Sequence, residues 1–286
     1  MERKINLEEF LKFPSYDRVV EKEITESNSV KKLISKKFYE KNDLVAKQIF
    51  EKNGEVYSSD SFASLTIFSK GKIKTEVFYL NGKIGRINRP AIMNYYVGDQ
   101  ISSQIKSEVF LLNGKVSDQK IFPAVTIYFN NSNRISKIIH VKDNLFHNDN
   151  GPAYLRFGFD RTLKEKIFYK NGKKHNENGP AEIIYTFRRK IMKIEYDIDG
   201  KVTRDNGPAI IELNCSSINN SDCYLVYYVK DEKFHNLNGP AFFEINVKTK
   251  EKSNFEYYVD GEKLQDEFSF EVKKALYLNE KEKEYL

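Results

Sequence analysis

Three histidines occupy the same place in an internal repeat, and such a set could be the start of a zinc site. They are His147, His175 and His235, each followed by Asn-x-x-Gly-Pro-Ala. Equivalent positions in successive β-hairpins lie two strands apart, about 9.5 Å. Zinc ligands must lie closer together, because each bonds the ion at about 2.0 to 2.1 Å. We therefore predict no metal and a structural role, in which each imidazole and the next asparagine bond backbone groups before Gly-Pro.

Other catalytic chemistry has no support in the residue pattern. No Ser or Cys stands beside a positioned base, and no glycine-rich phosphate loop is present. The acids Glu182, Glu212 and Glu244 fall between apolar residues of predicted strands, so we expect them on a solvated face and not as an acid-base pair. The sequence predicts a protein that is not an enzyme and that uses no cofactor.

The elements that must position these residues are repeats marked by proline. Six of the seven prolines are each followed by alanine, at spacings of 33, 29, 28, 28 and 32 residues: Pro90, Pro123, Pro152, Pro180, Pro208 and Pro240. Each begins a predicted strand, where a missing N–H costs little, and the small alanine allows close packing between units. A period of this length predicts a stacked array.

A turn-forming pair precedes each of these prolines by about nine residues and predicts a hairpin in every unit. The pairs are Asn81-Gly82, Asn113-Gly114, Asp143-Asn144, Asn171-Gly172, Asp199-Gly200 and Asp231-Glu232. The structural glycines are Gly82, Gly114, Gly172 and Gly200. Two outer units lack the proline: Asn53-Gly54 leads to Phe62-Ala63, and Asp260-Gly261 leads to Ser269-Phe270. Eight units result.

A column of rings stands four residues before the second turn residue. Its members are Phe50, Phe78, Phe110, His140, Phe168, Tyr196, Tyr228 and Tyr257. The flanking apolar set changes phase between units: Val77 and Tyr79 in one, but Ile194, Tyr196 and Ile198 in another. Such a change moves the apolar set to the other face unless a bulge absorbs it, and the sequence leaves both possibilities open.

The predicted fold is all-β: an elongated antiparallel array of about eight hairpins with short helical caps at both ends. Residues 1–43 form an N-terminal cap, with a helix over 5–12, and degenerate strands; residues 44–270 form the array; residues 271–286 form a C-terminal helical cap and tail, with apolar residues at 272, 275, 276 and 278. Extra residues at 98–103 and 215–222 lengthen loops at one edge.

Composition favours a protein of the cytoplasm. The net charge of +6 arises from 47 basic and 41 acidic residues spread along the chain. This distribution indicates a solvated surface in the first place. No secretory or membrane-spanning run is present. The two cysteines, Cys215 and Cys223, are expected as free thiols.

The aromatic-x-Asn-Gly-Lys hairpin and the run His-Asn-x-x-Gly-Pro-Ala resemble the MORN-repeat proteins, and more closely the variant group that includes YwqK-type antitoxins and repeat arrays of large DNA viruses. The resemblance covers roughly residues 44 to 270. It implies hairpins used as a scaffold, docking surface or membrane-proximal spacer. A viral source would place the protein in the host cytoplasm or the virus particle.

We therefore expect a non-catalytic scaffold or structural component that binds a protein partner along a sheet face or at the insertion-loop edge. Self-association into a homo-oligomer is a further possibility. His147, His175 and His235 are candidate contacts to the partner. Alternative functions are an antitoxin or immunity-type inhibitor that blocks a toxin or nuclease, and a peripheral binder of anionic membrane. The aromatic column is assigned to core packing in preference to nucleic-acid stacking.

Overall fold

The computed structural model describes residues 2–4, 18–24, 33–39, 45–58, 63–97, 104–119, 121–130, 132–214 and 222–284. The chain divides into two compact units, residues 2–162 and 163–286, and each is described by itself. The predicted helix over 5–12, the inserted segments 98–103 and 215–221, and Cys215 lie outside the described residues.

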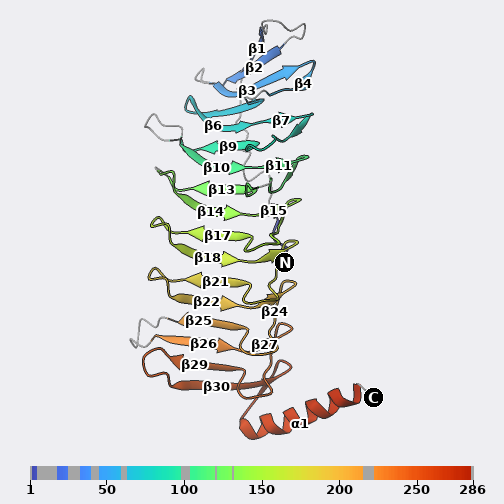
Figure 1. The fold of residues 1–286 in the computed structure, drawn as a ribbon, viewed down its shortest axis with the longest axis vertical. Helices are drawn as coiled ribbons and strands as arrows, with labels where there is room; N and C mark the ends of the chain where they lie inside the picture. Colours follow the sequence, from blue (N-terminus) through green and yellow to red (C-terminus); the bar gives the residue numbers. More distant parts are fainter. Residues whose placement is uncertain are drawn as a thin grey trace. The chain divides into compact units, whose positions relative to one another are not determined.

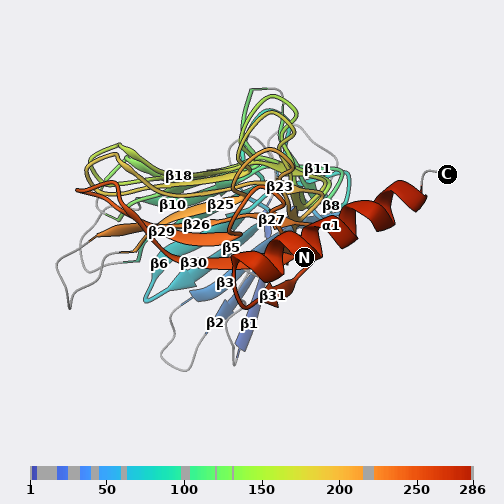
Figure 2. The same cartoon turned by 90° about the horizontal axis from the view of Figure 1, so that it is seen from below.

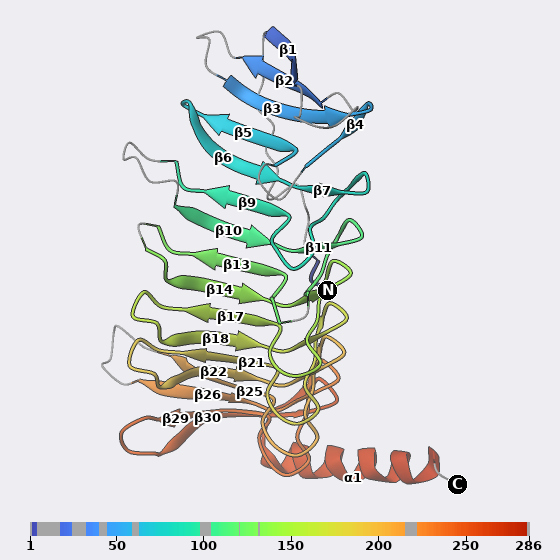
Figure 3. The same ribbon diagram turned by 45° about the horizontal axis from the view of Figure 1, so that its top comes forward.

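In residues 2–162 the wide strands form an antiparallel sheet in which each strand pairs with the next along the chain (Figures 1 and 3). The strands are β1 (Arg18–Ile24), β2 (Leu33–Tyr39), β3 (Val45–Lys52), β5 (Leu65–Ser69), β6 (Lys72–Val77), β9 (Ile92–Tyr95), β10 (Ile105–Val109), β13 (Val125–Tyr128), β14 (Ile135–Ile139) and β17 (Tyr154–Phe157).

Residues 163–286 repeat the pattern and end in a helix. Each strand again pairs antiparallel with the next. The elements are β18 (Leu163–Ile167), β21 (Glu182–Tyr185), β22 (Ile191–Glu195), β25 (Ile210–Asn214), β26 (Cys223–Tyr227), β29 (Phe242–Asn246), β30 (Lys252–Val259), β31 (Glu262–Leu264) and α1 (Glu267–Glu284). The predicted all-β class, built from antiparallel hairpins, is confirmed.

The predicted turns close small hairpins that stand apart from the wide strands (Figure 2). Both residues of every predicted pair have positive φ, for example 52° at Asn81 and 72° at Gly82, as a type I′ turn requires. The small hairpins are β7 (Tyr79–Leu80) with β8 (Lys83–Ile84), β11 (Leu111–Leu112) with β12 (Lys115–Val116), β15 (Val141–Lys142) with β16 (Leu145–Phe146), β19 (Tyr169–Lys170) with β20 (Lys173–Lys174), β23 (Asp197–Ile198) with β24 (Lys201–Val202), and β27 (Val229–Lys230) with β28 (Lys233–Phe234).

The ring column marks the point where wide strand and small hairpin separate. From Phe78 to Tyr228 each column residue donates its N–H to the carbonyl of the alanine after Pro, at 2.7 to 2.8 Å, and accepts through its own carbonyl from the residue seven positions later, at 3.0 to 3.2 Å. In most units the strand that we expected to run unbroken into the turn therefore ends one residue before the column. It is not one strand but two.

The alanines fit this junction because they are small. All six that follow proline are fully buried, and four of them, such as Ala181, donate to the carbonyl just before the next column residue. In the first outer unit Phe50 donates instead to Ser64, not to Ala63. The expected Phe62-Ala63 equivalence is therefore one residue too early.

The break also settles the question of phase. The residues just before and just after the column residue point inward in successive units, as Val109 and Leu111 do at 0% and 1% exposed. In the unit of Tyr196 the inward positions hold Glu195 and Asp197, which are also buried, while Ile194 and Ile198 are half-buried. The backbone frame stays constant, so two acids enter the core and the apolar residues do not.

Helix α1 begins earlier than predicted and presents a different face to the sheet. Asp266 caps it, accepting a hydrogen bond from the Ser269 amide at 2.8 Å. Phe270 is buried against the Tyr257 ring, with centroids 5.2 Å apart. The apolar residues expected to pack, Val272 and Leu276, are instead exposed at 47% and 54%.

The segment at residues 2–4 lies beside the small hairpin β15–β16. The amide of Phe146 donates to the carbonyl of Arg3 at 3.2 Å, and Lys4 forms a bridge with Leu145. The Arg3 guanidinium lies 5.7 Å from the centre of the Phe146 ring. The polypeptide therefore adds a neighbour from far away in sequence to this hairpin.

Replacing Ala124 by leucine tests the packing at the junction. Ala124 has no exposed surface, so we expect Ala124→Leu to lower the free energy of unfolding by about 1 to 3 kcal/mol through overpacking. Urea denaturation checks this value. Ala275→Leu on the exposed side of α1 is the matched control and should change stability little; equal effects of the two substitutions would contradict the packing described.

Candidate binding site

The position seven residues after each ring-column residue is here called the slot. In residues 163–286 its side chain joins one small hairpin to the next. In the slot, His175 accepts through Nδ1 the N–H of Asp199 at 3.1 Å, and His235 accepts that of Asp260 at 3.0 Å. Thr203 does the same through Oγ1 for the amide of Asp231 at 3.1 Å. In each case the donor is the first turn residue of the following unit. His175 and His235 thus bond backbone groups, but these belong to the turn of the following unit and not to the bend before Gly-Pro. For His147 the structural role stays a prediction.

The asparagine after each histidine bonds within its own loop. Asn148, Asn176 and Asn236 donate through Nδ2 to the carbonyl of the proline four residues later, at 2.9 to 3.0 Å. Each also accepts, through Oδ1, the amide two residues on. These bonds are the local backbone contacts that the sequence predicts before Gly-Pro.

The three histidines offer a partner little free surface. The side chains of His147 and His175 are 10% and 9% exposed. The His235 ring lies 5.2 Å from that of Tyr277 on α1, and burial lowers the pKa of His235. Their assignment as partner contacts stays a prediction that this burial does not favour.

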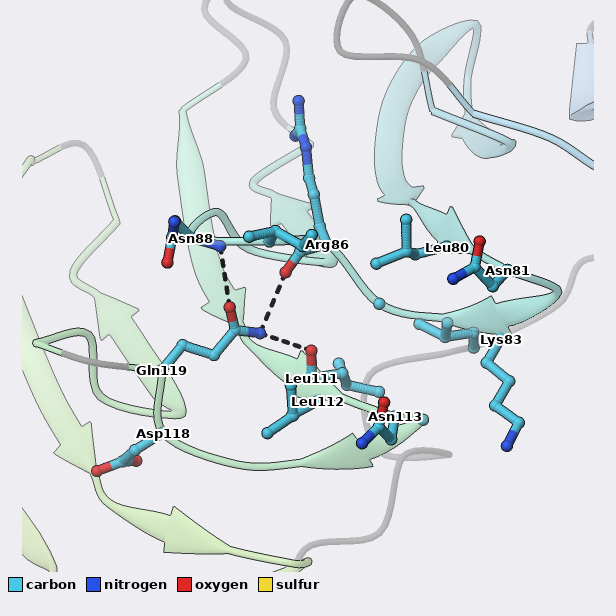
Figure 4. Close-up of a pocket in the computed structure, with 14 residues that line it drawn as sticks. Leu80, Asn81, Lys83, Arg86, Asn88, Leu111, Leu112, Asn113, Asp118 and Gln119 are labelled. Carbon is cyan, nitrogen blue, oxygen red and sulfur yellow. Dashed lines mark hydrogen bonds between the residues drawn. The ribbon is translucent and has the colours of Figure 1, made fainter.

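Gly85 is the one slot residue in the series without a side chain. The other slots hold Tyr57, Ser117, His147, His175, Thr203, His235 and Leu264. Near this slot the side chain of Gln119 bridges the loops of two units (Figure 4). Its Nε2 donates to the carbonyls of Leu111 at 2.6 Å and Arg86 at 3.1 Å, and its Oε1 accepts from the Asn88 amide at 3.0 Å. The glutamine supplies contacts that backbone groups make elsewhere in the array.

A cavity of about 460 Å³ opens at Gly85 between the small hairpins β7–β8 and β11–β12. Its mouth carries three apolar side chains, Leu80, Ile87 and Leu112, exposed at 43%, 68% and 53%. Amides of asparagine and glutamine make up most of its polar lining. A pocket of this size with apolar walls and a few polar groups is typical of a ligand site.

Two of the charged residues beside the cavity already have partners. The Arg86 guanidinium lies 3.8 Å from the centre of the Phe78 ring. Asp118 accepts from the amides of Ala124 and Val141 and contacts Nδ1 of His140 at 2.6 Å. Lys83 is the remaining charged residue of the lining. The site is therefore weakly cationic and suits a neutral ligand better than a cation.

A second cluster, built from charged side chains, occupies core positions of residues 163–286. Lys174 Nζ lies 2.7 Å from Glu182 and 2.8 Å from Glu195, and Lys193 Nζ lies 3.2 and 2.7 Å from the same two acids. Asp197 is 3% exposed. Other units hold Val116, Ile92, Val109 and Leu111 at the positions of Lys174, Glu182, Glu195 and Asp197.

The buried position of Glu182 corrects the expectation of a solvated face. The residue is 7% exposed and lies directly opposite Glu195 in the register of β21 and β22, whereas Glu212 and Glu244 are half-buried. The expectation was wrong because strand phase was judged from apolar neighbours. Comparison of the repeats could have revealed this cluster, because charged residues stand at repeat positions that hold apolar residues in the other units.

The acids of the cluster are tuned in opposite directions. Burial opposes ionisation of Glu195, but hydrogen bonds from Lys174 and Lys193 outweigh it and lower its pKa. Burial, and then the negative charge of Glu195, raise the pKa of Asp197 to about 6. Two lysines thus neutralise two glutamates, and Asp197 is the group that holds a proton under mildly acidic conditions.

The opposite pKa shifts of Glu195 and Asp197 resemble those of the acid and base of an active site. The cluster is, however, poorly accessible to a substrate. The side chains of Glu182 and Glu195 are 9% and 10% exposed, and both are bonded to lysines. A substrate would have to displace those lysines. The arrangement fits a structural role better, in which it helps to fix the pairing of β21 with β22, because a buried charge needs a partner of opposite charge.

Three searches of the protein found nothing. Within the described ranges, no three His, Cys, Asp or Glu side chains gather closely enough to hold a metal ion. No helix in the same ranges is both long and apolar enough to cross a bilayer. No family model, curated protein or solved structure matches the chain.

Replacing Asp197 by asparagine tests the raised pKa. Because the folded pKa, about 6, lies above the unfolded value of about 3.9, the wild-type free energy of unfolding should fall as pH rises from 4 to 7. We expect Asp197→Asn to remove this loss and to be more stable by roughly 2 kcal/mol at pH 8. Urea denaturation from pH 4 to 8 measures it.

The matched control is Asp231→Asn, at the exposed first turn position of the next unit, which should keep the wild-type pH dependence. A parallel pH dependence of Asp197→Asn and wild type, or a loss of stability at pH 8, would show that Asp197 is not the titrating group.

Proposed function

We propose that this protein is a non-catalytic binding module that holds a segment of a partner protein in the cavity at Gly85. The observation that carries the proposal is that cavity: about 460 Å³ between β7–β8 and β11–β12, at the slot that has no side chain. The repeats around it serve as the scaffold. This use agrees with the scaffold role that the resemblance to MORN-like arrays implies.

The chemistry of the mouth favours a polypeptide ligand. Leu80, Ile87 and Leu112 together expose apolar surface on both sides of the opening, and exposed apolar surface rimmed by polar groups marks protein-binding sites. Asn81, Asn88 and Asn113 lie around the same opening (Figure 4). Amide side chains can both donate to and accept from a peptide backbone.

Selection from a displayed peptide library tests this function. We expect full-length protein to enrich peptides that bind it, and Leu112→Glu to weaken binding by about tenfold or more. The reason is that a carboxylate replaces an apolar contact worth roughly 1.5 to 3 kcal/mol. Fluorescence anisotropy measures the dissociation constants.

The matched control is Leu276→Glu on α1, where the leucine is 54% exposed against 53% for Leu112. This variant should bind the selected peptides as the wild type does. If no peptide is enriched, or if Leu112→Glu binds as tightly as the wild type, the cavity is not the binding site.

A further inference from the structure

The other slots show what kind of group fits the space at Gly85. In two of them a histidine ring fills the slot and accepts, through Nδ1, the amide hydrogen of the next turn: Asp199 for His175 and Asp260 for His235. The His175 side chain is 9% exposed there. The counterpart of those amides at Gly85 is the amide of Asn113, the first residue of the next turn.

Gly85 leaves this counterpart without a side-chain acceptor from the slot. Nothing in the backbone demands glycine, because Gly85 is absent from the positive-φ residues. A Cβ built on it would lie 3.7 Å from the Leu111 carbonyl oxygen and 4.0 Å from Leu80 Cβ, which are ordinary contacts. The cavity at Gly85 therefore reaches the place that a slot side chain takes in the other units.

We propose that the cavity recognises an unprotonated histidine ring supplied by the partner, seated where the slot histidines of other units sit. Its ring nitrogen accepts the Asn113 amide hydrogen, and residues flanking that histidine pack on Leu80, Ile87 and Leu112. This inference rests on the proposed function, since it names the group by which the partner is held.

The charges around the cavity require the neutral ring. Protonation would remove the acceptor nitrogen and place a cation near Lys83 and Arg86, while the carboxylate of Asp118 is already engaged by Ala124, Val141 and His140. A free histidine has a pKa of about 6.5. Binding is therefore strongest above that value and declines as pH falls through it.

Two synthetic peptides, acetyl-Leu-His-Leu-amide and acetyl-Leu-Phe-Leu-amide, test the inference on the full-length protein. We expect the histidine peptide to move the Asn113 amide proton downfield in NMR titrations at pH 7.5. Its affinity should drop about tenfold at pH 5.5, as the neutral fraction of the ring does. The phenylalanine peptide should bind about tenfold more weakly at pH 7.5, without that shift and without pH dependence.

Gly85→His supplies the ring from within the chain and should abolish binding of the histidine peptide. Asn178→His, an exposed addition outside the cavity, should leave it unchanged. Equal binding of the two peptides, an unmoved Asn113 amide, or undiminished binding by Gly85→His would overturn the inference. The Asn113 resonance decides the matter in wild-type protein should Gly85→His fail to fold.

The two proposals fail in different ways. If the phenylalanine peptide binds as well as the histidine peptide and Leu112→Glu weakens both, the cavity is a peptide site without histidine recognition. If neither peptide binds and Leu112→Glu has no effect on the library-selected peptides, the proposed function fails as well.

Discussion

The architecture depends on how one backbone unit per repeat forms its hydrogen bonds. The amide of each inner ring-column residue bonds the alanine carbonyl, and its own carbonyl accepts from the slot. With both groups engaged this way, the chain leaves the wide sheet and starts a small hairpin. Because the junction brings two backbones close together, it holds small buried residues, alanine in six units and Ser64 in the first. The alanine of the proline-alanine step thus meets a steric limit set by the column bond.

A frame fixed by backbone bonds lets side chains vary without moving the strands. At Glu195 and Asp197 the frame carries acids into the core, and lysines from β20 and β22 pair with Glu195 and with Glu182 opposite it. At Gly85 the frame keeps its course although a side chain is missing, and a cavity of about 460 Å³ lies beside that residue. A residue that differs from the repeat therefore changes the local chemistry and leaves the backbone unchanged. For this reason the residues that differ, and not the shared ones, suggest function.

The sequence allowed the hairpins, their turns and the histidine slot to be predicted, because positive-φ pairs and Asn-x-x-Gly-Pro act over a few residues. It did not allow the break at the column to be predicted, since this break is set by a bond to an alanine about thirteen residues away. The burial of Glu182 was missed because strand phase was judged from its apolar neighbours. The outward face of α1 was missed because the Phe270 contact with Tyr257, and not the stripe at Val272 and Leu276, orients the helix.

The placement of Arg3 and Lys4 beside β16 has a consequence for the order of folding. Their seat is formed by Leu145 and Phe146, which leave the ribosome about 140 residues later. Neighbouring hairpins can assemble as they are synthesised, because their contacts are local. Residues 2–4 can dock only after β15 and β16 have been synthesised. Closing so large a loop also costs more entropy than closing a hairpin. Residues 2–4 would therefore dock late in folding, after the neighbouring hairpins have formed.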